Sequence, residues 1–260
     1  MKAPFKLGRR VKVPAEQGLI RPMVDLSSEM AELAEHLGLA NAGGAQATSG
    51  RVVQFVSAET GEGASTVARE FARHAAQTAR RGVWLIELDL LRGEQHAAIE
   101  ADPARYGALG EATRASSDGS MFFDVTPKLK GVDGRSWPDA RYLEAYPVGK
   151  ARWWVSRFRR DVLRPGQSVR ILNAPSYWSM LRTHADLIVI DAPSAERSQV
   201  SLAVAPNADA NVLVVAGDRR NTKAPLALRD SITEAGGYCA GLVFNRAPAE
   251  PPQFLKSILP

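Results

Sequence analysis

The chain has 260 residues, 45% hydrophobic and 23% charged, which is enough to bury one sizeable core and excludes a fibrous or disordered protein. Its 33 Lys and Arg against 28 Asp and Glu give a net charge of +5, a weak argument for an acidic, lipid or nucleic-acid partner. The single cysteine excludes an internal disulfide, and no stretch approaches the roughly 18 apolar residues of a membrane span, so we expect a cytoplasmic protein.

Residues 1–50 are predicted to form a basic N-terminal arm, a short helix and a linker. The basic residues of the arm are Lys2, Lys6, Arg9, Arg10 and Lys12. A serine cap and the apolar spacing over 27–39 predict one helix, and the sequence NAGGAQATSG at 41–50 is typical of a flexible linker. The arm is either a solvated tail or a docking element for an anionic membrane surface or an acidic partner.

From residue 51 onward, apolar runs alternate with helical patterns. The predicted strands are 52–56, 83–88, 187–190, 212–216 and 240–244, and the predicted helices are 66–80, 199–205 and 222–235. Because the apolar runs are continuous, both faces of each strand should be covered. The predicted fold class is therefore α/β, a doubly wound, mostly parallel sheet flanked by helices, with its ligand site beyond the strand C-termini.

A glycine loop, SAETGEGAST at 57–66, joins the first predicted strand to a helix. Gly61 and Gly63 allow backbone N–H groups to turn toward a phosphate, and the helix N-terminus adds positive partial charge. The phosphate-loop motif requires a lysine before Ser65, and that position is Ala64. On the loop alone, an ordinary glycine turn between a strand and a helix remains the alternative.

Three carboxylates fall at predicted strand ends. Glu87 and Asp89 close the second strand, and Asp191 closes the strand LIVI. An acid at such a place beside a phosphate loop commonly holds Mg²⁺ together with the loop hydroxyl. The sequence therefore predicts a magnesium site formed by Ser65, Asp89 and Asp191, whereas each acid taken singly could be a helix cap or a loop residue.

The segment 94–168 is long for a connection and contains KARWWVSRFRRDVL at 150–163. Trp154, Phe158 and Val162 follow at i, i+4 and i+8, which predicts one face of a helix with arginines around the remainder. The aromatic residues either pack on the sheet or form a contact surface for an anionic partner.

The motifs resemble those of the cytoplasmic domain of bacterial tyrosine autokinases, the BY-kinases, within the wider group of MinD and ParA ATPases. SAETGEGAST resembles the Walker A loop, LIELDLLRG the second acidic motif and LIVIDAPS the Walker B strand, and the resemblance covers about 51–93 and 168–247. Glu59 stands where the MinD and ParA branch carries its signature lysine, which favours the autokinase branch. The resemblance implies the P-loop NTPase architecture over 51–260, with an unmatched insert at about 94–168.

The resemblance also indicates which residues correspond to the family's site. The degenerate nucleotide-binding set is Gly61, Glu62, Gly63, Ala64, Ser65, Thr66 and Asn245. Glu87 replaces the aspartate expected to act as base, and no tyrosine follows Tyr238 where the family carries its phosphate-accepting cluster. We therefore assign no catalytic residue and expect no required cofactor, with weak ATP or ADP binding in the presence of Mg²⁺ at most.

By this resemblance the protein is expected to be a catalytically impaired partner of an inner-membrane polysaccharide co-polymerase. It would regulate exopolysaccharide biosynthesis, export or chain length at the inner membrane, with self-association as a further option and no nucleic acid as partner. Two alternatives stay open. One is an active ATPase that takes its cation from Arg92 or from an arginine of the 150s. The other is a MinD- or ParA-like positioning or secretion factor.

Overall fold

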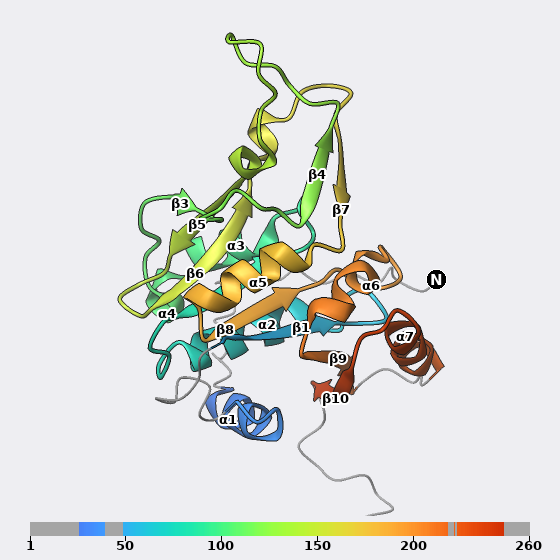
Figure 1. The fold of residues 1–260 in the computed structure, drawn as a ribbon. Helices are drawn as coiled ribbons and strands as arrows, with labels where there is room; N and C mark the ends of the chain where they lie inside the picture. The colour runs from blue at the N-terminus through green and yellow to red at the C-terminus, as the bar shows by residue number, and fades with distance from the viewer. Residues whose placement is uncertain (1–25, 40–48, 218–220, 222, 247–260) are drawn as a thin grey trace, which may run out of the picture.

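The computed structural model describes residues 26–39, 49–217, 221 and 223–246 (Figure 1). The basic arm at 2–12, most of the predicted linker and the C-terminal PPQFLKSILP lie outside the described residues. No helix within the described part is long and apolar enough to cross a membrane.

An eight-stranded mixed sheet runs through the molecule in the order β10-β9-β1-β8-β2-β6-β5-β3. Five of its strands lie where the apolar runs predict them: β1 (Arg51–Val56), β2 (Val83–Glu87), β8 (Leu187–Asp191), β9 (Ala210–Ala216) and β10 (Cys239–Asn245). These five and β6 (Trp153–Phe158) pair in parallel, while β5 (Leu143–Pro147) and the short β3 (Thr113–Arg114) add an antiparallel edge. The predicted mostly parallel sheet is confirmed.

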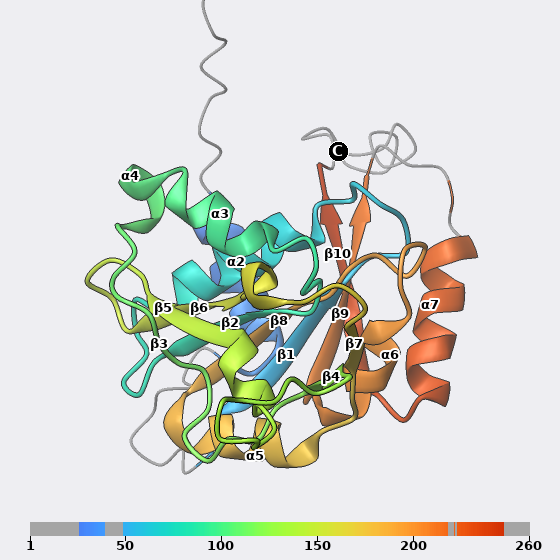
Figure 2. The same ribbon diagram turned by 90° about the horizontal axis from the view of Figure 1, so that it is seen from above.

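Helices cover both faces of the sheet (Figure 2). One face carries α1 (Ser27–His36), α2 (Ala64–Ala75) and α3 (Glu94–Glu100); the other carries α5 (Pro175–His184), α6 (Val200–Val204) and α7 (Lys223–Glu234). Because both faces are covered, every residue of β8 and β9 is buried, which explains their unbroken apolar runs. The helix predicted over 66–80 is shorter at its C-terminal end than expected, since α2 ends at Ala75 and residues 76–78 form a turn.

The prediction of a helix over 150–163 is wrong. Residues Trp153–Phe158 form β6, which pairs with β2 on one side and with β5 on the other, and only a short 3₁₀ turn, η2 (Arg160–Val162), follows. Pairing on both sides satisfies the backbone of the segment, and its aromatic and β-branched residues suit a strand. Trp154 is half-buried and Arg157 is exposed.

Part of the insert packs over α5. It contains β4 (Phe123–Thr126) and η1 (Asp139–Tyr142) and leads to β7 (Ser168–Ile171), while η3 (Ala205–Asn207) follows α6 outside it. The short α4 (Pro103–Tyr106) lies instead on the α2 face, where the ring of Tyr106 is 6.4 Å from that of Trp153. β4 and β7 pair antiparallel as a separate two-stranded sheet. The ring of Phe122 lies 5.1 Å from Tyr177 and 5.4 Å from Trp178 of α5, so the insert shares the main hydrophobic core.

Candidate functional site

The loop between β1 and α2 has the shape that the sequence predicts. Gly61 and Gly63 have φ values of +84° and +94°, a backbone region that favours glycine. Gly63 caps α2, and a Cβ placed on it would lie 2.0 Å from Nδ2 of Asn245. The Asn245 amide donates to the carbonyl of Glu62 at 2.9 Å, so its side chain holds the loop against the end of β10.

Carboxylates of the chain itself accept hydrogen bonds from this loop. Glu62, a residue of the predicted nucleotide-binding set, is 2% exposed, and its carboxylate accepts from the N–H of Glu59 at 2.8 Å and of Ala216 at 3.3 Å. The carboxylate of Glu196 accepts from the N–H of Thr60 at 2.9 Å. Two N–H groups at the start of the loop, those of Glu59 and Thr60, are therefore directed at carboxylates of the chain itself.

The helical end of the loop carries no cation. Ala64 is buried at the start of α2 and packs in the core on the face of the sheet that α2 covers. Thr66 is exposed, and its N–H donates to the carbonyl of Gly63. Ser65 donates its hydroxyl to Oδ1 of Asp191 at 3.1 Å, so the loop hydroxyl and the strand-end acid are brought together as expected.

Gln95 connects these two residues, and the sequence analysis did not identify it. Its amide group donates to Oδ2 of Asp191 at 2.6 Å and to the carbonyl of Ser65 at 2.8 Å. Its oxygen accepts from Arg69 at 2.8 Å, which fixes the orientation of the amide. Burial raises the pKa of Asp191 to about 6, and the hydrogen bonds from Gln95 and Ser65 oppose that rise.

Glu87 caps a helix. Its two oxygens accept from the N–H groups of Glu94 and Gln95, at 2.8 and 3.0 Å, at the start of α3. Burial, with the charge of Asp191 as a second cause, raises the pKa of Glu87 to about 8. Of the two roles that the sequence leaves open for this acid, a site residue or a helix cap, the structure shows the helix cap.

The described residues do not fit Mg²⁺ as they are arranged. Both oxygens of Asp191 already accept from an amide or a hydroxyl, and Asp89 forms an ion pair with Arg197. An amide N–H₂ group and a guanidinium repel a cation rather than bind it. Among the described residues there is no group of three or more His, Cys, Asp or Glu side chains that could hold a metal ion. The magnesium site stays a prediction that this geometry disfavours.

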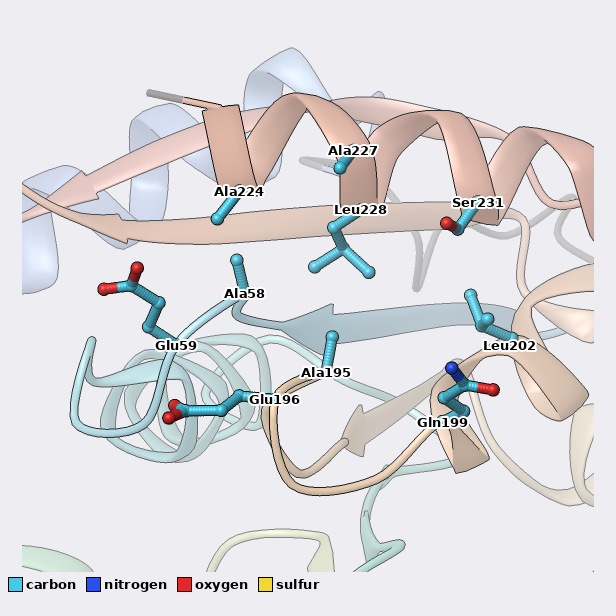
Figure 3. Close-up of a pocket in the computed structure, with 10 residues that line it drawn as sticks. All are labelled: Ala58, Glu59, Ala195, Glu196, Gln199, Leu202, Ala224, Ala227, Leu228 and Ser231. Atoms are coloured by element: carbon cyan, nitrogen blue, oxygen red, sulfur yellow. The ribbon is translucent and has the colours of Figure 1, made fainter. Parts of the chain in front are cut away.

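A cleft of about 600 Å³ lies beside the first half of the loop (Figure 3). Glu59 and Glu196 lie together at one end of it, and Ala58, Ala195 and Leu228 form an apolar middle. Carboxylates at the end nearest the loop repel the phosphates of a nucleotide. The cleft therefore presents the wrong charge for a nucleotide at this position.

Comparison with solved structures identifies the fold. The chain aligns with the chimerical protein CapA2B2 at a TM-score of 0.56 and 16% identity over 88% of each chain. It aligns with the BceF tyrosine kinase domain at 0.53 and 17% identity over 86% of this chain and 76% of the other. It aligns with the kinase domain of the Escherichia coli tyrosine kinase ETK at a TM-score of 0.50 and 16% identity over 78% of this chain and 69% of the other.

These similarities show that the chain shares the α/β fold of bacterial tyrosine kinase domains. The predicted architecture is thus confirmed. At 16–17% identity to these three structures, the similarity shows the fold and does not imply the activity. No protein-family model matches the sequence, and no curated protein matches it either.

Proposed function

We propose that the protein is a catalytically impaired, kinase-like partner of a membrane polysaccharide co-polymerase and that it acts without using nucleotide. The observation that carries the proposal is the loop. It keeps its shape while Ala64 replaces the lysine and the carboxylates of Glu62 and Glu196 accept from its N–H groups. A protein that retains the fold, lacks the lysine and places its own carboxylates beside the loop is suited to binding a partner rather than to catalysis.

Nucleotide affinity is the first test. A charge-assisted hydrogen bond contributes roughly 1.5–3 kcal/mol, so losing one or two should weaken ATP binding about 10-fold to 10⁴-fold. Calorimetric titration with Mg²⁺ and ATP should therefore give millimolar affinity or none. A low-micromolar dissociation constant, or steady phosphate release that Asp191→Ala abolishes, would place the ATPase alternative ahead.

The loop variants give this test a matched design. Ala64→Lys alone should restore little binding, because the negative charges of Glu62 and Glu196 remain beside the loop. Adding Glu62→Gln and Glu196→Gln to Ala64→Lys removes both negative charges and should restore the most. If Ala64→Lys alone binds ATP as well as the triple variant, the internal carboxylates do not block the site.

Recruitment to the membrane is the second test. Basic residues near an anionic leaflet contribute about 1 kcal/mol each, which salt screens, so a protein contact should supply the remainder. Deleting residues 1–25 should release the protein from membranes that contain the co-polymerase. The deletion stops before α1, because Met30 and Ala34 of that helix are buried. Asp191→Ala is the control that should leave the protein bound; release by Asp191→Ala instead would contradict a nucleotide-independent role.

A further inference from the structure

A cleft of about 850 Å³ opens in the insert beside β3. β3 is the edge strand of the sheet opposite β10 (Figure 1). We define the insert cleft by its walls, which are the loop 112–119, the turn 137–141, the start of β5, and Arg159 and Val162 after β6. It is larger than the cleft beside the phosphate loop and within the size range of small-molecule sites. It shares no lining residue with the phosphate loop.

The walls of the insert cleft carry an excess of guanidinium groups. Arg114, Arg141 and Arg159 line it against the carboxylates of Asp118 and Glu144. Glu144 is committed to Arg159 at 3.5 Å and to the hydroxyl of Tyr146 at 2.9 Å. Arg114 and Arg141, in contrast, are exposed and have no carboxylate within 4.0 Å among the residues that the structure describes.

The walls are held in place before any ligand arrives. The guanidinium of Arg141 lies 4.9 Å from the ring centre of Trp137, a cation–π contact that limits its motion. The carbonyl of Ala115 accepts from the Tyr177 hydroxyl at 3.3 Å, which ties the loop 112–119 to α5. A cleft with fixed walls costs less conformational entropy to occupy.

We propose that the insert cleft binds a small anionic sugar, one that carries a phosphate or a carboxylate. Arg114 and Arg141 would bind the anionic group, since guanidinium forks match the oxygens of either one. The carboxylate of Asp118 is an acceptor for a sugar hydroxyl, and Trp137 supplies an apolar wall. A bare phosphate fits less well, because it brings no hydroxyl-bearing ring to Asp118 and Trp137. The proposal is independent of the proposed function.

The test is calorimetric titration of the full chain with four probes: UDP-glucuronic acid, glucose 1-phosphate, trigalacturonic acid and neutral maltotriose. The anionic probes should bind and maltotriose should bind at least tenfold more weakly. Binding of only the phosphorylated probes assigns an activated sugar, and binding of only trigalacturonic acid assigns an acidic oligosaccharide. Binding of maltotriose with equal affinity, or no binding of any probe at millimolar concentration, overturns the proposal.

Variants locate the binding. Arg114→Gln and Arg141→Gln should each weaken binding of the anionic probes about tenfold, as expected for the loss of one charge-assisted contact. Both residues are exposed, so the melting midpoint should not change. Arg170→Gln, an exposed arginine of β7 outside the cleft, is the matched control and should bind as the parent does. Binding that survives the combined Arg114→Gln and Arg141→Gln replacement also overturns the proposal.

Discussion

The two adjacent tryptophans of β6 should differ sharply in their contribution to stability. Trp153 is 1% exposed and packs in the core on the α2 face, with Tyr106 at 6.4 Å. Trp154 points to the opposite face, is half-buried and stacks on Trp84 at 5.8 Å. Truncating a buried Trp to Ala costs about 3–5 kcal/mol, so we expect that cost for Trp153→Ala and about 1–2 kcal/mol for Trp154→Ala.

Urea unfolding of the parent and both variants measures these costs. Thermal unfolding gives a second measurement. For a domain of this size each kcal/mol of lost stability lowers the melting midpoint by about 2–4 °C, so the two variants should be well separated. A double-mutant cycle of Trp84→Ala with Trp154→Ala should show a coupling of about 0.5–1.5 kcal/mol from the stacked rings. If Trp154→Ala costs as much as Trp153→Ala, the alternation of a strand does not describe this segment.

Two further changes test buried carboxylates. The pKa of Glu87 is near 8 in the folded state and 4.5 as its ordinary value, so its contribution is complete below pH 4.5 and is lost as pH rises through 8. We compare the free energies of unfolding of Glu87→Gln and the parent by urea unfolding at pH 5 and at pH 8. The difference, variant minus parent, should rise by about 2–4 kcal/mol from pH 5 to pH 8, because only the parent loses stability over that range. A difference that is the same at both pH values would contradict the raised pKa. Glu70 is fully buried and accepts from Arg73, Arg105 and Tyr106, so Glu70→Gln should cost about 2–4 kcal/mol, whereas Asp230→Asn in an exposed pair should cost under about 0.5 kcal/mol.

The parallel core of the fold could be predicted because its strands are buried on both faces, which leaves runs such as LIVI without a polar interruption. The insert could not be predicted in the same way. Trp154, Phe158 and Val162 are four residues apart, a spacing compatible with a helix of period 3.6 and with a strand of period 2. Pairing with β2 and β5 decides between the two, and that pairing depends on residues distant in the sequence.

The same limit applies to the candidate site. The glycine positions predict the shape of the loop, and the strand ends predict that Ser65 and Asp191 lie close together, as they do in the structure. The sequence does not indicate that Glu196 accepts from Thr60, because the two residues are 136 positions apart. Gln95 also carries no local signal, since it is one polar residue near the start of a short helix. The motif thus predicts where a ligand would bind, and the tertiary contacts determine what fills that place.

The carboxylates inside the loop also affect how the stability of the protein responds to the cell. A ligand that binds only the folded state raises its free energy of unfolding by an amount that depends on ligand concentration. The carboxylates of Glu62 and Glu196 already accept from the N–H groups of Glu59 and Thr60. If the protein acts without ATP, as we propose, its free energy of unfolding gains nothing from that ligand. The folded fraction, and with it the supply available to a partner, would then not depend on the concentration of ATP in the cell.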